Sequence, residues 1–70
     1  MKLKDLLPII FANRFVIANA DQDMLIIWQG TKHEAGYEIL QRVYANYNVD
    51  QIRIRKDGVA YITISKEWLL

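Results

Sequence analysis

Apolar and polar residues alternate most regularly on the two sides of Asp57-Gly58, a strong hairpin turn signal. A two-residue loop would mix polar and apolar side chains on each face of this hairpin. A three-residue loop, Lys56-Asp57-Gly58 with Gly58 left-handed, pairs Arg55 with Val59. It places the isoleucines on one face and most polar side chains on the other, so we predict that register. One face then carries Ile52, Ile54, Ala60, Ile62 and Ile64, and the other carries Gln51, Arg53, Arg55, Val59, Tyr61 and Thr63.

Two earlier runs of aliphatic, β-branched and aromatic residues, Arg14–Ala20 and Met24–Gln29, flank the turn Asp21-Gln22-Asp23 and predict a second hairpin. If Ala20 pairs with Met24, both faces of this hairpin are largely apolar. Such a strand pair is either covered on both sides or meets another chain. One face would carry Val16, Ala18, Ala20, Met24, Ile26 and Trp28, and the other Phe15, Ile17, Asn19, Leu25, Ile27 and Gln29. The pattern leaves open which of them is exposed.

Two helices complete the pattern. We expect the first over Leu3–Ala12, with Asp5 as N-cap and Pro8 in the first turn, where proline is tolerated. A strand is the weaker alternative, because Pro8 fits only a sheet edge. Thr31 and Glu34 match a capping box and predict a second helix from about Lys32 to about Asn46. Its apolar stripe is Ala35, Ile39, Leu40, Val43 and Tyr47, flanked by Tyr37 and Tyr44.

The element order α-β-β-α-β-β predicts an α+β fold, with a four-stranded antiparallel sheet and two helices on one face. Seventy residues without a linker or repeat indicate a single domain, residues 1–70. So short a chain buries only about 60% of its unfolded surface. It has no cysteine and one histidine, so its apolar residues, 53% of the chain, must supply the core without a disulfide or a structural metal.

Residues that could carry catalysis are few. The chain has one serine, Ser65, and His33 lies next to Glu34, so these two side chains diverge around a helix. Asp21 and Asp23 lack the further oxygens and the glycine of a calcium loop. Glycine-rich phosphate loops and histidine pairs are absent from the sequence. We therefore predict a protein that is not an enzyme, with no catalytic residues, cofactor or metal.

Charge and hydropathy bear on the partners and the cellular location of the chain. The net charge of +1 points to neither nucleic acid nor an acidic partner. No apolar run approaches the roughly 18 residues of a membrane span. Ala18-Asn19-Ala20 has the small-x-small form of a signal cleavage site, but Asn13 and Arg14 interrupt the apolar stretch before it. Because the chain also has no cysteine, nothing argues for a disulfide-bonded secreted domain, and we predict a cytoplasmic protein that does not bind membranes.

Association with another protein has the broadest support in the sequence. The first hairpin is apolar on both faces, and Trp68-Leu69-Leu70 form an apolar tail. Docking of this tail on its own core is an alternative, because a small domain needs all its aromatic residues. We predict a homodimer or a different protein partner. The proposed contacts are Phe15, Ile17, Leu25, Ile27, Trp28, Trp68 and Leu69.

Nucleic-acid binding is the second hypothesis. The exposed face of the last hairpin places Arg53 opposite Tyr61 and Arg55 beside Val59, with Lys56 at the tip. Basic side chains around an aromatic ring on a sheet can contact phosphates and stack a base. Arginine and tyrosine on neighbouring strands also form a solvated cation–π contact with no ligand. The sequence signature of RNA-binding domains is absent.

Three segments resemble a known group of proteins. The opening Lys2-Leu3-Lys4-Asp5-Leu6-Leu7, the strand pair ending Trp28-Gln29-Gly30 and the closing Asp-Gly hairpin are similar to short uncharacterised proteins of bacterial phages and mobile elements. The resemblance implies an accessory binder or inhibitor of a larger protein. It implies no site residues.

Overall fold

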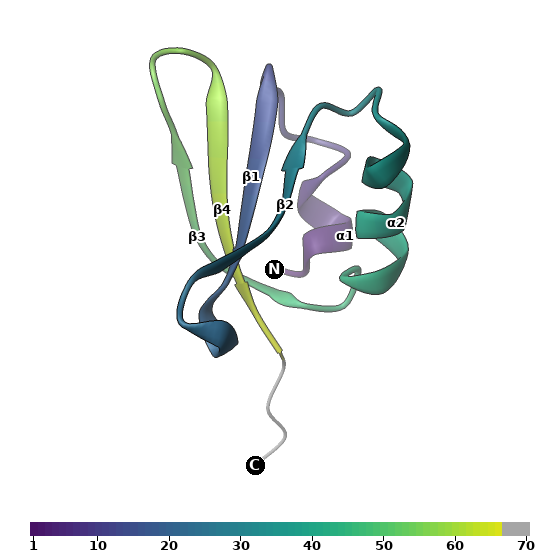
Figure 1. Ribbon diagram of the computed structural model, residues 1–70, viewed down its shortest axis with the longest axis vertical. Helices are drawn as coiled ribbons and strands as arrows, with labels where there is room; N and C mark the ends of the chain where they lie inside the picture. The colour runs from purple at the N-terminus through teal and green to yellow at the C-terminus, as the bar shows by residue number, and fades with distance from the viewer. Residues whose placement is uncertain (67–70) are drawn as a thin grey trace.

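The computed structural model describes residues 1–66 and has the predicted order of helices and strands (Figure 1). A short 3-10 turn, η1, joins the first two strands. The elements are α1 (Leu3–Leu6), β1 (Arg14–Asn19), η1 (Ala20–Gln22), β2 (Leu25–Gly30), α2 (Ala35–Val43), β3 (Asn48–Ile54) and β4 (Val59–Ser65). The predicted α+β class is confirmed.

The sheet is mixed rather than fully antiparallel, which corrects the predicted topology. Its strand order is β2-β1-β4-β3. Both hairpins are antiparallel, but β1 and β4 lie side by side in parallel, with Phe15 opposite Ala60 and Ile17 opposite Ile62. Hydrophobic alternation identifies each hairpin but does not show which of its strands meets the other hairpin. The two most buried strands occupy the centre of the sheet.

Both helices pack on one face of the sheet, as predicted (Figure 1). On that face Phe15, Ile17, Ala60, Ile62 and Ile64 are at most 1% exposed. The helical side of the core comes from α1, the segment after it, and α2. It consists of Leu3, Leu6, Leu7, Ile10, Tyr37 and Leu40. The opposite face of the sheet carries neither helix, and we call it the open face.

The register of the second hairpin agrees with the prediction. Arg53 pairs with Tyr61 and Ile54 with Ala60. The Arg55 amide donates to the Val59 carbonyl at 2.9 Å, which closes the three-residue loop. Gly58 has a φ of 85°, in the left-handed region that glycine adopts without strain.

The first hairpin follows the predicted register only near its turn. Ala18 pairs with Ile26, but a β-bulge then shifts the register so that Ile17 lies opposite Trp28. A bulge sets two residues of one strand against one residue of its partner. Ile27 and Trp28 consequently both pack against the core, and the prediction that Trp28 shares a face with Ile26 is wrong.

The helices are shorter than predicted. Helix α1 begins at Leu3, so Pro8 falls beyond its first turn, where proline ends a helix. Helix α2 begins only at Ala35, and Glu34 makes no side-chain capping bond. Its buried stripe contains Tyr37 and Leu40, whereas Ile39 and Val43 are exposed. Among the described residues, neither helix has the length and apolar character needed to cross a membrane.

Candidate interaction surface on the open sheet face

The open face consists of rows of side chains that run across the four strands. Alternation along each strand and the pairing between strands place three or four side chains in each row. The row nearest the β3–β4 turn is Arg55, Val59 and Arg14. The second row consists of Arg53, Tyr61, Val16 and Gln29. The third row consists of Gln51, Thr63, Ala18 and Ile26.

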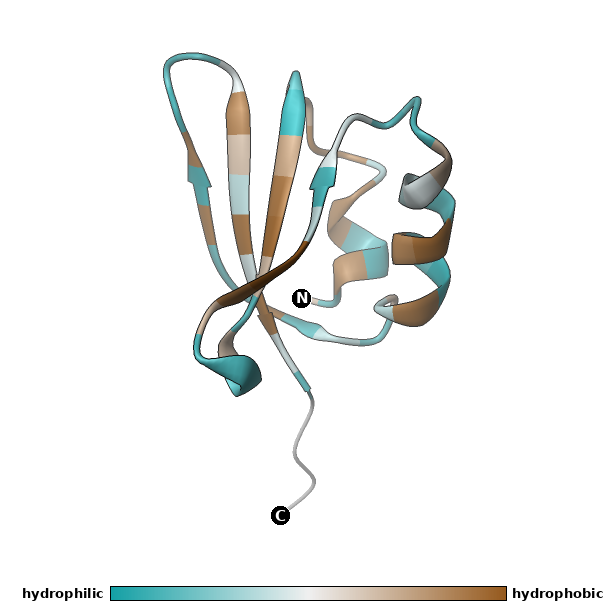
Figure 2. Ribbon diagram, in the orientation of Figure 1, coloured by the Kyte–Doolittle hydropathy of each residue, from teal (hydrophilic) through white to brown (hydrophobic). Residues whose placement is uncertain are grey.

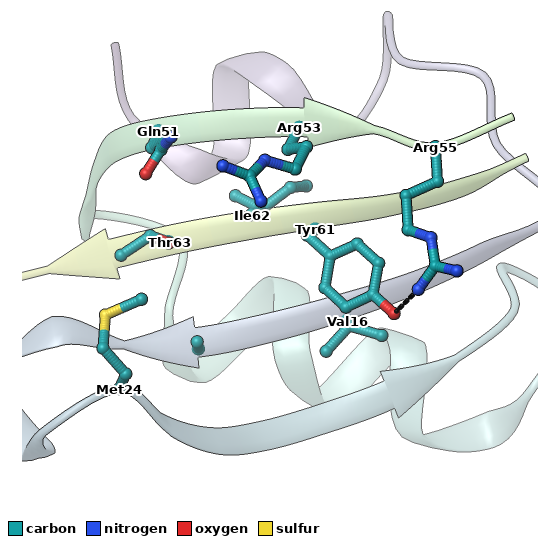
Figure 3. A pocket seen from close by; sticks show the side chains of 9 residues that line it. Val16, Met24, Gln51, Arg53, Arg55, Tyr61, Ile62 and Thr63 are labelled. Atoms are coloured by element: carbon teal, nitrogen blue, oxygen red, sulfur yellow. Dashed lines mark hydrogen bonds between the residues drawn. The ribbon is translucent and has the colours of Figure 1, made fainter.

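Three arginines occupy the end of this face near the β3–β4 turn, and we call Arg14, Arg53 and Arg55 the basic end. All three are exposed. Arg55 donates from Nη1 to the hydroxyl of Tyr61 at 3.0 Å, as Figure 3 shows, and its Nη2 lies 3.7 Å from Asp57 Oδ2. The hydrogen bond to Tyr61, and then the charge of Asp57, raise the pKa of Arg55. The hydrogen bond holds the charged guanidinium against the ring.

Three exposed aspartates, Asp21, Asp23 and Asp50, lie at the opposite end of the sheet, where Lys66 is the exposed basic residue beside Asp21. We call these three aspartates the acidic end. Asp21 accepts from the Lys66 amide at 2.7 Å, and Asp50 accepts from the Ser65 hydroxyl at 3.0 Å. These two bonds place both carboxylates beside the last residues of β4. Asp23 follows η1, which curls away from the helices (Figure 1).

The middle of the open face is a shallow apolar depression of about 470 Å³. Val16, Ala18, Tyr61 and Thr63 line it. Figure 3 shows the side chains of Val16, Tyr61 and Thr63 there. Met24 closes it at the acidic end, and Arg55 closes it at the basic end. Ile26, which continues the row of Ala18, is 52% exposed. Figure 2 shows hydrophobic residues along β1 and the first half of β2, and hydrophilic turns at both ends of the sheet.

The structure separates the residues predicted to bind a protein. Phe15 and Ile17 are fully buried in the core and cannot touch a partner, because the open face carries the other parity of β1. Ile27 and Trp28 pack partly against the core. Leu25 is 55% exposed, at the turn end of β2. Trp68 and Leu69 lie outside the described residues.

The residues predicted to bind nucleic acid are brought together. Arg53, Arg55 and Tyr61 line the depression. Lys56 lies beside them at the hairpin tip and is exposed. The guanidinium carbon of Arg55 lies 5.6 Å from the centre of the Tyr61 ring, in cation–π range.

Sequence reasoning missed the contribution of β1 to this surface. Arg14, Val16 and Ala18 join the second hairpin only through the parallel pairing of β1 with β4. Their common parity along β1 was visible in the sequence. Nothing in the sequence showed that these three side chains lie on the same face of the sheet as Tyr61.

Comparison with known proteins adds no relative. The chain matches no protein-family model, and no curated protein or solved structure matches it. The resemblance to short phage and mobile-element proteins stays a prediction.

Proposed function

We propose that this chain is a non-enzymatic association module whose open face binds the surface of another protein molecule. The observation that carries this proposal is the apolar middle of a sheet face that no helix among residues 1–66 covers, whereas both helices pack on the other face. A sheet face left apolar in a small domain gains free energy when a second surface removes it from water. Ile26, at 52% exposed, and the half-buried Ala18 and Tyr61 supply most of that apolar area, with Val16 buried beneath them, and charged groups surround it.

The rim of this surface favours a protein partner. Protein interfaces combine an apolar middle, aromatic and arginine residues, and a polar rim. The open face has this composition, with Tyr61 at its middle and Arg53 and Arg55 beside the ring. We further propose that the chain acts in the cytoplasm, since its sequence contains no cysteine.

Nucleic-acid binding remains the second candidate, and Arg14 now adds a third arginine near Tyr61. Two features weigh against it. The Tyr61 hydroxyl is already held by Arg55, and the acidic end would repel a phosphate backbone that continued along the same face. A short strand crossing only the basic end is the geometry that this candidate requires.

Photo-crosslinking tests the proposal. Benzoylphenylalanine replaces Ile26 on the open face in one variant and Ile39 on α2 in the control. The two positions are matched, being 52% and 56% exposed. Irradiation in the native cells should give nuclease-resistant protein adducts from position 26 and none from position 39. Equal adducts from both positions, or none from position 26, would contradict the proposal.

A titration of labelled single-stranded DNA and RNA at two salt concentrations tests the second candidate. Binding that falls steeply with salt and is lost in Arg53→Glu would favour nucleic acid. Adducts from position 26 that disappear on nuclease treatment would favour it as well. Absence of binding at low salt would exclude this candidate.

A further inference from the structure

We infer that the partner of the open face is a second copy of this chain, stacked face to face with its strands running in the opposite direction. This inference rests on the proposed function and names the partner. It is carried by the separation of charge along the open face. The arginines lie at one end of the strands and the aspartates at the other, with the apolar depression between them.

The two ends are far enough apart to act separately. Arg14 begins β1, and Asp21 and Asp23 come just after it ends. Six residues of strand at about 3.3 Å each span roughly 20 Å on the β1 side, and the five positions from Asp50 to Arg55 span roughly 17 Å on the β3 side, where Arg53 lies closer to Asp50, at roughly 10 Å. The screening length at physiological ionic strength is about 8 Å, so each end interacts with what lies directly above it. A partner must therefore present acidic groups over one end and basic groups over the other.

A second copy meets this requirement in one of its two symmetric arrangements. A twofold axis between the sheets and parallel to the strands would place basic end over basic end. An axis that runs across the strands reverses their direction and places the basic end of each copy over the acidic end of the other. The second arrangement brings Arg14 toward Asp21 and Asp23 of the other copy, and Arg53 and Arg55 toward its Asp50. Symmetric pairs of this kind are the commonest oligomers of soluble proteins.

The middle of the face suits the same arrangement. The axis passes near the rows of Tyr61 and Thr63, so Val16, Ala18 and Tyr61 of each copy meet the same residues of the other. Apolar area is thus covered by apolar area, as in aligned sheet packing. Four strands about 4.8 Å apart and roughly 20 Å long give a small interface. We therefore expect weak association, with dissociation in the micromolar range.

The test measures mass by sedimentation equilibrium from about 1 µM to about 500 µM, a range that brackets weak association through a small interface. The chain should shift from 8.2 kDa toward twice that mass. One variant reverses the basic end with Arg14→Glu and Arg53→Glu. A second reverses the acidic end with Asp23→Lys and Asp50→Lys. Each variant alone should remain at 8.2 kDa, because like charges then face each other at both contacts.

A mixture of the two variants should recover the doubled mass, since opposite charges meet again at both contacts. This recovery also shows that both variants are folded. A wild-type chain that stays monomeric over the whole range overturns the inference. Variants that dimerise as well as wild type, or a mixture that does not dimerise, overturn it too.

Engineered cysteines test the direction of the strands, since the chain has no cysteine of its own. A mixture of Arg14→Cys and Asp23→Cys chains should form a mixed disulfide. Neither variant should crosslink with itself. Self-crosslinking of Arg14→Cys without the mixed product would indicate the other axis and overturn the arrangement.

The photo-crosslinking at Ile26 separates the two proposals. Nuclease-resistant adducts to a different protein, together with a monomeric purified chain, would overturn only the second copy as partner. The absence of any such adduct, together with a monomeric chain, would remove both.

Discussion

Trp28 lies directly over Gly36, so that a Cβ atom added at Gly36 would come within 2.6 Å of Trp28 Nε1. The contact joins β2 to the first turn of α2. The same indole packs against Tyr37, with ring centres 5.9 Å apart. Glycine inside a helix costs about 1 kcal/mol relative to alanine. Here that cost permits the close approach of strand and helix.

We expect Gly36→Ala to destabilise the protein, although alanine is the better helix former. The added methyl group would push Trp28 from its position, and overpacking of this kind costs about 1–3 kcal/mol. Urea unfolding measures the change. Gln41→Ala, at an exposed position of α2, is the control and should change stability by less than about 0.5 kcal/mol. A more stable Gly36→Ala variant would show that the indole does not rest on this glycine.

Gly58→Val should destabilise the β3–β4 turn. Gly58 has a φ of 85°, which a β-branched residue resists, and its missing Cβ leaves room for the Asn13 side chain. Strain of this type costs about 1–3 kcal/mol. Thermal unfolding measures it, with Lys56→Val as the control in the same loop. Repeating Gly58→Val in an Asn13→Ala background separates the backbone strain from the contact. Unchanged unfolding of Gly58→Val would refute the left-handed turn.

Lys32→Met should destabilise the connection between α1 and β1. The Lys32 ammonium donates to the carbonyls of Leu7 and Ile10, both at 2.9 Å, and is partly buried there. Methionine keeps the length of the side chain and removes the donor, which leaves two carbonyls unpaired. Hydrogen bonds to charged groups contribute about 1.5–3 kcal/mol, and urea unfolding should show a loss of that order. Lys56→Met, at the exposed hairpin tip, is the control. Equal stability of the two variants would contradict a structural role for Lys32.

Stability should fall at alkaline pH because of Tyr37. Burial raises the pKa of its hydroxyl above the ordinary value of about 10. The folded state therefore favours the neutral phenol, and this contribution is complete below the unfolded pKa and is lost as pH rises through the folded pKa. Urea midpoints measured from about pH 9 to about pH 12 should fall less steeply in Tyr37→Phe. Tyr44→Phe controls for the loss of a hydroxyl at the end of α2. Equal slopes for wild type and Tyr37→Phe would contradict this contribution.

The elements of the fold could be predicted from local patterns. Alternation with Asp57-Gly58 determined the register of the second hairpin, because one slipped residue would turn its isoleucines to water. The bulge opposite Ile17 was not predictable, since it depends on Trp28 reaching Gly36 across the core. The difference between the predicted and the observed buried side of α2 also depends on contacts across the core. Tyr37 is drawn inward by Phe15 and Trp28, and Ile39 is left outside.

Only the part of the candidate site that lies on the β3–β4 hairpin could be predicted from the sequence. Arg53, Arg55 and Tyr61 could be placed on one surface from the hairpin alone. Their combination with Arg14 and Val16 depends on the parallel pairing of β1 with β4. Residues far apart in the sequence carry no local signal of which strands become neighbours.

That parallel pairing also governs how the chain reaches its native state. Each hairpin involves only neighbouring residues, so both can form within microseconds. The sheet is complete only when residues 14–19 meet residues 59–64, which requires closing a loop that contains β2, α2 and β3. Non-local contacts of this kind slow folding because the entropy of loop closure is lost before the contacts form. We therefore expect the meeting of the two preformed hairpins to limit the folding rate. Substitutions in the two turns and at the β1–β4 seam should then slow folding, because these contacts are formed in the transition state.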